Sequence, residues 1–161
     1  MTSPPKDSIK VLSFLEPEEV WEYGLPSVAV QGTFSDPQCT PEGFKVNRAF
    51  IEFMHDVIGT VGPTDPSMQK EAARQENGYL YVIDLRTPEG PQGRVPAEDI
   101  IGGFEVRNGR LVAGSYRPNA GHRVFTKSGV VQLAPSLHEA LVRAALERAR
   151  DALKKSRAQP E

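Results

Sequence analysis

Apolar residues recur along this chain with two periods, and each period predicts a different element. Over residues 47–58 they fall at spacings of three and four, the pattern of one face of an α-helix. Asn47 precedes this stripe and suits the N-cap position. A second helical stripe follows Ser136, which together with Glu139 has the spacing of a capping box. We expect one helix at 47–58 and another from Ser136 to about Lys155.

Two shorter helices are indicated by an acidic residue followed by proline, a pair that favours a helix N-terminus. The first pair, Glu16-Pro17, opens a helix of one or two turns that ends at Gly24. The second pair, Asp65-Pro66, opens a more polar helix that continues to about Gln75.

Short runs rich in aromatic and β-branched residues predict the strands. The clearest run is 79–85, where only Asp84 interrupts the apolar character, and we expect it at the centre of a sheet. Asn108-Gly109 predicts a two-residue type I′ hairpin, because both residues of that turn adopt positive φ. Further strands are expected at 9–14, 28–30, 104–107, 110–116, 122–126 and 130–133.

The expected fold class is α+β, with an antiparallel sheet of about six or seven short strands and about three helices packed mainly on one face. The 161 residues suit one domain, which we place at 9–156. The polar ends, 1–8 and 157–161, are expected to be disordered segments. The apolar periods place seven residues in the core: Phe50, Met54, Val57, Leu80, Val82, Leu141 and Leu146.

Composition and charge restrict the function classes. The 19 basic and 21 acidic residues give a formal net charge of −2, so charge alone does not favour nucleic acid as a partner. No apolar run reaches the ~20 residues that span a bilayer, and we expect a cytoplasmic protein with no membrane partner. The single cysteine, Cys39, excludes an internal disulfide and a zinc site built from paired thiolates. We expect no metal and no cofactor.

One connection between predicted strands gathers residues that suit anion binding. Arg117, Asn119, His122 and Arg123 lie close together in the sequence, and guanidinium groups recognise carboxylate or phosphate in a bidentate manner. The alternative interpretation is that 118–121 forms a favourable turn with solvated arginines beside it. These four residues are the candidate binding residues.

Three basic residues of the C-terminal helix, Arg143, Arg150 and Lys154, form a second candidate surface for a protein partner. The alternative is a solvated helix end whose cations complement the helix dipole. Cys39 has no basic neighbour in the sequence that would lower its thiol pKa, and His55 has no identifiable partner. We expect neither residue to be catalytic.

The sequence contains no phosphate-loop, dinucleotide-turn, nucleophile-elbow or paired-histidine motif. We therefore expect a small non-enzymatic binding or adaptor protein that acts through protein–protein interaction, with self-association left open. The alternative is a hydrolase or transferase that holds an anionic substrate with Arg117, His122 and Arg123. Its base would be a carboxylate such as Asp84 or Asp99. Convergence of these side chains on one concave pocket would favour the enzyme, and divergence would favour the binding protein.

Overall fold

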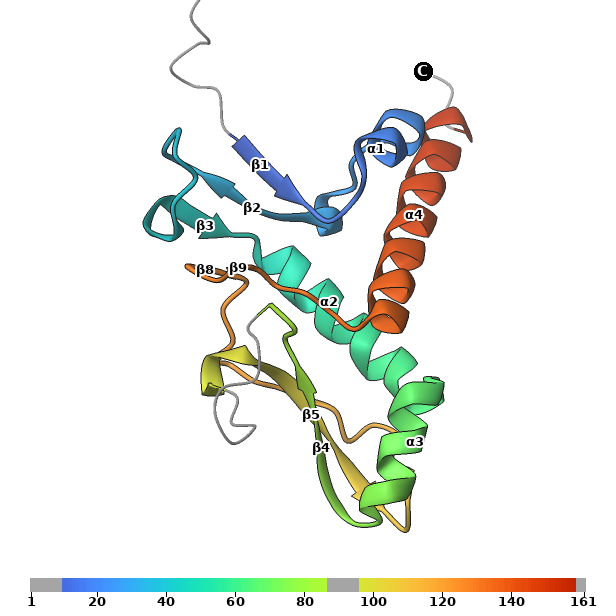
Figure 1. Cartoon of the computed structure of the whole chain (residues 1–161). Helices are drawn as coiled ribbons and strands as arrows, with labels where there is room; N and C mark the ends of the chain where they lie inside the picture. The colour runs from blue at the N-terminus through green and yellow to red at the C-terminus, as the bar shows by residue number, and fades with distance from the viewer. Residues whose placement is uncertain (1–9, 87–95, 159–161) are drawn as a thin grey trace, which may run out of the picture. The chain divides into compact units, whose positions relative to one another are not determined.

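The computed structural model describes the backbone of residues 10–86 and 96–158, with side chains through residue 155 (Figure 1). Contacts group the described residues into two compact units. One belongs to Met1–Ile51 with Ala145–Glu161, and the other to Glu52–Ala144. The single domain expected at 9–156 stays a prediction, and the segment 1–8 lies outside the described residues.

The first unit contains a three-stranded antiparallel sheet in the order β1-β2-β3. Its strands are β1 (Lys10–Ser13), β2 (Val30–Phe34) and β3 (Phe44–Val46). Gly32 is required at its position on β2, because a Cβ there would lie 2.3 Å from Cζ of Phe44. The centroids of the Phe44 and Phe34 rings are 5.2 Å apart. Aromatic packing between β2 and β3 therefore stabilises this sheet.

Helix α1 (Pro17–Tyr23) confirms the short helix predicted after Glu16. The Glu16 amide donates to Oε1 of Glu19 at 2.9 Å, so an acidic side chain satisfies a backbone donor at the N-terminus. The helix ends at Gly24, whose φ of 88° is a conformation that glycine adopts readily.

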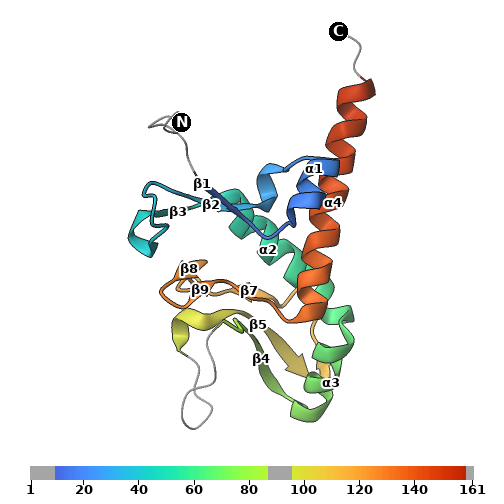
Figure 2. The ribbon, with the colours of Figure 1, turned by 45° about the horizontal axis from the view of Figure 1, so that its top comes forward.

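The second unit contains a four-stranded antiparallel sheet in which β5 pairs with β4, β6 and β7 (Figure 2). Its strands are β4 (Gly78–Ile83), β5 (Ile100–Arg107), β6 (Arg110–Leu111) and β7 (Arg117–Pro118). Asn108 and Gly109 have φ values of 53° and 75°, and Arg107 pairs with Arg110. The predicted hairpin is therefore confirmed. The central position predicted for 79–85 is wrong, because β4 pairs with β5 alone among the described strands.

Two further strands of the second unit, β8 (Phe125–Thr126) and β9 (Gly129–Val130), pair only with each other in the described chain. The α+β class and the antiparallel pairing are confirmed, with four α-helices among the described residues. The prediction of one sheet is wrong, because the described strands form three sheets. Each sheet joins strands that are near one another in the sequence. The alternation of apolar and polar residues predicts that a segment is a strand, but it does not predict which other strand it pairs with.

The three longer helices are α2 (Arg48–Val61), α3 (Pro66–Gln75) and α4 (Pro135–Ala158). Oδ1 of Asn47 accepts the Ala49 amide at 3.3 Å, so the predicted cap of α2 is confirmed. Asp65 caps α3 by accepting the Met68 amide at 3.1 Å. Helix α4 includes the first two residues of the tail expected at 157–161, and the rest of that tail lies outside the described residues.

Short 3-10 helices occupy several connections: η1 (Ser27–Ala29), η2 (Pro41–Gly43), η3 (Gly62–Thr64) and η5 (Ala97–Asp99). The strand predicted at 28–30 is wrong for its first two residues, which belong to η1. The Ala29 amide donates to the Pro26 carbonyl at 3.0 Å and closes this turn before β2 begins at Val30. Prolines and glycines recur between residues 87 and 96 and predict a loop, which lies almost entirely outside the described residues.

The predicted core is largely confirmed. The buried members are Phe50, Met54, Val57, Val82 and Leu141, whereas Leu80 and Leu146 are half-buried. On α4 the buried apolar positions recur every four residues: Leu137, Leu141, Ala145 and Ala149. No helix of the described chain combines the length and the apolar content needed to cross a bilayer.

Strand β4 presents its two faces to different environments. Val82 is buried on the same side of the sheet as Phe104, which is fully buried. Gly62 gives this ring its space, because a Cβ there would lie 2.4 Å from Cζ of Phe104. Tyr79 and Tyr81 alternate with the inward residues and are 53% and 56% exposed. Two aromatic rings therefore stand on the open face of this sheet.

Candidate functional site

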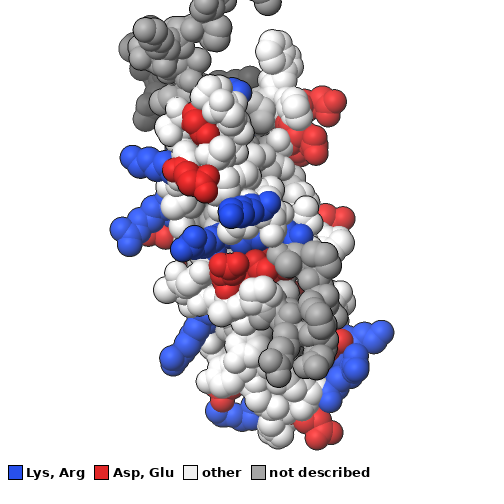
Figure 3. All heavy atoms as spheres, turned by 60° about the vertical axis from the view of Figure 1, so that its left-hand side comes forward, with Lys and Arg blue, Asp and Glu red and all other residues white. Residues whose placement is uncertain are grey.

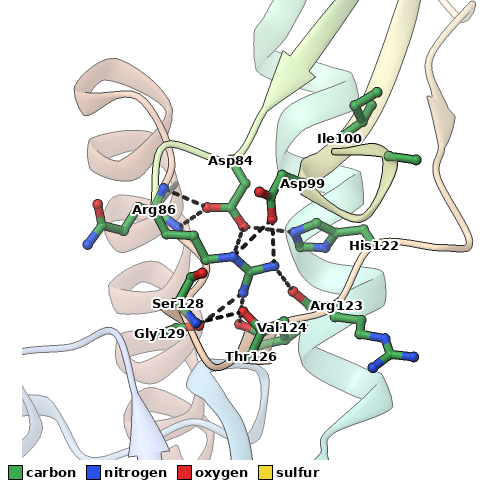
Figure 4. A network of polar contacts seen from close by, with 12 residues as sticks. Asp84, Arg86, Asp99, Ile100, His122, Arg123, Val124, Thr126, Ser128 and Gly129 are labelled. Atoms are coloured by element: carbon green, nitrogen blue, oxygen red, sulfur yellow. Dashed lines mark hydrogen bonds and ion pairs between the residues drawn. The ribbon is translucent and has the colours of Figure 1, made fainter. Parts of the chain in front are cut away.

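Four titratable side chains are buried together beyond the end of β4, and we call them the Arg86 cluster (Figure 4). Asp84, Arg86, Asp99 and His122 expose only 0%, 1%, 4% and 2% of their side chains. They come from three separate stretches of the chain: the end of β4, η5 and the segment after β7. Because buried ionisable groups are costly unless paired, the contacts within the cluster decide what it can do.

Arg86 joins two carboxylates to the backbone of neighbouring segments. Its Nε lies 3.2 Å from Oδ2 of Asp84, and its Nη2 lies 3.4 Å from Oδ1 of Asp99. Its terminal nitrogens also donate to the backbone carbonyls of three residues, Arg123, Val124 and Gly129, at 3.0 Å for the last two. The guanidinium therefore uses its donors for internal partners. These bonds connect η5, β9 and the segment that leads into β8 to the end of β4.

Asp84 is equally engaged. Its Oδ2 accepts Nε2 of His122 at 3.0 Å, and its Oδ1 accepts the amides of Gln132 at 2.9 Å and Arg86 at 3.1 Å. Burial raises the pKa of this carboxyl, but the hydrogen bonds from His122, Gln132 and Arg86, with the Arg86 charge, outweigh burial and hold the pKa below its usual value. Asp84 is thus an ionised structural acceptor, and taking a proton from a substrate would disrupt its bonds.

His55 and Tyr116 form a second polar contact in the same unit, and both residues are half-buried. Nδ1 of His55 and the Tyr116 hydroxyl are 2.7 Å apart, and the Tyr116 ring centroid lies 4.9 Å from that of Phe104. Burial raises the pKa of Tyr116. Burial and the charge of His122 lower the pKa of His55, against a smaller opposite effect of Asp56.

The lowered pKa of His55 predicts a pH dependence of stability. The folded chain binds this proton more weakly than the unfolded chain, so stability should fall as the pH drops below about 6.5 toward 5. His55→Gln should remove that part of the slope, whereas His138→Gln on the exposed side of α4 should keep it. Urea unfolding at several pH values measures both slopes, and identical slopes for wild type and His55→Gln would contradict the prediction.

The structure does not bring the four predicted binding residues together. His122 points into the Arg86 cluster, whereas the side chain of Arg123 points away from it (Figure 4). Asn119 donates to the carbonyls of Ala97 at 2.9 Å and Ile100 at 2.8 Å, so its amide organises the turn and η5. Arg117 lies exposed on β7.

Sequence reasoning missed Arg86, which is the centre of the buried cluster. The available signal was Asp84 at the end of an apolar run, because a carboxylate there needs a nearby cation. Arg86 stands two residues further on. The sequence instead drew attention to Arg117 and Arg123, whose surroundings are rich in turn residues.

A groove of about 380 Å³ lies on the open face of the four-stranded sheet, and we call it the sheet groove. Its lining comes from four elements and the turn after β7: Tyr79, Tyr81, Ala97, Ile100, Gly102, Gly103, Arg117, Pro118 and Asn119. Tyr81 pairs with Gly103, and Gly103 pairs with Arg117, so the three residues form a row across β4, β5 and β7. Because the middle residue has no side chain, the Tyr81 ring lies close to its backbone, and a Cβ at Gly103 would stand 3.1 Å from Cδ1 of Tyr81.

Arg117 is the charged residue among those that line the sheet groove. Among the described residues, no carboxylate lies within ion-pairing distance of its guanidinium. Its donors therefore remain available to a ligand, in contrast to those of Arg86.

Cys39 and the basic residues of α4 have less support as functional residues. Cys39 is half-buried, and its sulfur lies 4.0 Å from the Pro37 carbonyl, without a nearby base in the described contacts. Arg143, Arg150 and Lys154 are all exposed on α4. Nη2 of Arg150 donates to the Tyr23 hydroxyl at 3.3 Å, with the guanidinium carbon 4.9 Å from the ring centroid. One of the three predicted helix contacts is therefore already engaged within its own unit.

Neither the charged side chains nor the potential metal ligands of the described residues point to a further site. On the face drawn in Figure 3, basic and acidic side chains are interspersed without a broad patch of one sign. Within residues 10–86 and 96–155, no three acidic, histidine or cysteine side chains are grouped as metal ligands would be.

Comparison of the chain with protein-family models, curated proteins and solved structures gave no significant match.

Proposed function

We propose that this chain is a non-catalytic cytoplasmic binding protein and that its partner is another protein. The observation that carries the proposal is the sheet groove, where Tyr79 and Tyr81 are more than half exposed and Arg117 has no carboxylate partner among the described residues. Tyrosine and arginine are enriched where protein interfaces derive most of their binding energy. A groove on a hydrogen-bonded sheet also keeps its shape, which lowers the entropy that binding must overcome.

The alternative, a hydrolase or transferase, has less support. It requires Arg117 and His122 to face one substrate together with a carboxylate base. Arg117 lines the sheet groove, His122 does not, and the candidate bases Asp84 and Asp99 are bonded to Arg86. The Arg86 cluster supports a structural role, because it fixes η5, which carries Ala97 of the groove wall.

The basic residues of α4 stay in the proposal as a secondary contact. Arg143 and Lys154 are exposed and project from one side of the helix, since their spacing of 11 residues is close to three full turns. Exposed charges of this kind affect the rate of association and its salt dependence more than the affinity.

Site-specific photocrosslinking tests the proposal directly. The full chain is prepared with p-benzoylphenylalanine in place of Tyr81 and irradiated in native cytosol. The matched control carries the same group at Arg110, which is exposed on β6 of the same sheet and outside the groove lining. We expect a discrete protein adduct from position 81 that is absent from position 110, and an adduct of twice the chain mass would identify the partner as a second copy.

Two results would count against the proposed function. One is the absence of any protein adduct at position 81. The other is the same set of adducts at both positions, which would mean that the groove contacts proteins no more than the rest of the sheet does.

A further inference from the structure

We infer that the sheet groove binds an extended peptide segment that places an acidic side chain against Arg117 and an apolar side chain against Tyr81. This inference rests on the proposed function and names the chemistry of the partner. It follows from the row Tyr81, Gly103 and Arg117, which sets an aromatic ring and a cation on opposite sides of a glycine. This cation has no carboxylate partner in the part of the chain that the structure describes.

The spacing of the row fits a single extended chain. Neighbouring strands lie about 4.8 Å apart, so the backbones of Tyr81 and Arg117 are separated by about 10 Å. Along an extended peptide, side chains that project to the same face repeat about every 6.8 Å. An acidic residue and an apolar residue two positions apart therefore face the row together, and the long side chain of Arg117 covers the remaining distance of about 3 Å.

The charge of the partner follows from Arg117. A guanidinium offers several N–H donors in one plane, and a carboxylate accepts two of them at once. The other lining residues are mainly apolar or aromatic, and the Asn119 amide is bonded to Ala97 and Ile100. A carboxylate thus complements Arg117, the charged residue of the groove lining, while an apolar neighbour covers the tyrosine ring.

The shape of the site favours a side-chain carboxylate over the end of a chain. The groove is open on a sheet face, so a peptide can continue past it in both directions. Recognition of a chain terminus relies on backbone N–H groups gathered around the carboxylate, whereas the charged group that lines this groove is the side chain of Arg117.

Peptide selection on the immobilised full chain tests the inference. One library displays random 12-residue peptides with the carboxyl end joined to the carrier, so that only side-chain carboxylates are offered. A second library displays free carboxyl ends. We expect binders from the first library that share Asp or Glu two positions from an apolar residue.

Variants then assign the contacts, with circular dichroism to verify that each one folds. A synthetic peptide with an amidated C-terminus, chosen from the first selection, should bind about tenfold or more weakly to Arg117→Glu and to Tyr81→Ala. Arg110→Glu makes the same charge change on the same sheet and should bind like wild type. Selection on Arg117→Glu should yield peptides with Lys or Arg in place of the acidic residue.

The outcomes separate this inference from the proposed function. Enriched peptides that lack a shared acidic residue, or whose binding ignores Arg117→Glu, would overturn the inference and leave a protein-binding groove. Binders from the free-end library alone would also overturn it. Failure of both libraries together with absent crosslinks at position 81 would overturn the proposed function as well.

Discussion

Replacing Arg86 with methionine should lower the free energy of unfolding by about 3–5 kcal/mol, the range measured when one partner of a buried ion pair is removed. Methionine keeps an unbranched side chain but supplies no charge and no donor. Asp84 and Asp99 would then be buried without their cation, and three backbone carbonyls would lose their hydrogen bonds. The cost arises from these uncompensated acceptors more than from the lost attraction itself.

Urea unfolding followed by far-ultraviolet circular dichroism measures this change. Tryptophan fluorescence is a poor probe, because Trp21 is 92% exposed in the folded chain. Arg107→Met is the matched control, since Arg107 pairs with Glu105 at the surface and its loss should cost less than about 1 kcal/mol. A loss below about 1 kcal/mol for Arg86→Met would contradict the assigned role of the cluster.

Arg86→Lys should recover only part of the loss. A single ammonium carries one point of charge, whereas the guanidinium reaches two carboxylates and three carbonyls with a planar set of donors. Full recovery by lysine would mean that charge alone, rather than the geometry of the donors, holds the cluster together.

Features encoded by neighbouring residues could be predicted from the sequence. Asn47 and Asp65 cap the helices that follow them, and Asn108-Gly109 turns the hairpin between β5 and β6. In each case the determining interaction spans only a few residues, so the sequence pattern contains all of it.

Pairing between distant segments could not be predicted in the same way. The run at 79–85 is strongly apolar and aromatic, which predicted a strand at the centre of a sheet. The structure instead exposes Tyr79 and Tyr81 on β4 at the sheet edge. A residue pattern gives no separate signal for an aromatic ring that faces solvent and one that faces the core, because both occur on strands.

The four candidate binding residues lie within seven positions of the sequence, but they do not form one site. Arg117 and Asn119 line the sheet groove, whereas His122 points into the Arg86 cluster. The side chain of Arg123 points away from that cluster (Figure 4). Tyr81 and Arg117 are 36 positions apart, yet they share a row because both strands flank Gly103. The proposed groove is therefore a product of strand register, which one sequence does not reveal.

The second large expected effect is a pH-dependent change in the free energy of unfolding when Asp84 of the Arg86 cluster is replaced. Asp84→Asn should lower the free energy of unfolding by about 2–4 kcal/mol at pH 7, because the asparagine amide meets donors at both oxygen positions. One orientation places its NH2 against Nε of Arg86, and the other places it against the amides of Gln132 and Arg86. Either way, buried N–H groups lose an acceptor, and Arg86 loses half of its counter-charge.

The same difference should disappear in acid. The pKa of Asp84 is lowered in the folded chain, so its contribution is complete above the unfolded value of about 3.9 and is lost as the pH falls through the lower folded value. Wild type should therefore lose stability toward pH 3 while Asp84→Asn loses less, and the two unfolding free energies should converge. Glu71→Gln, which removes the exposed partner of Arg74, should run parallel to wild type over the same range. The curves should converge because an ionised carboxylate held by His122 and Arg86 resists protonation more than the same group in the unfolded chain. Parallel curves for Asp84→Asn and wild type would instead show that protonation of Asp84 is not coupled to folding.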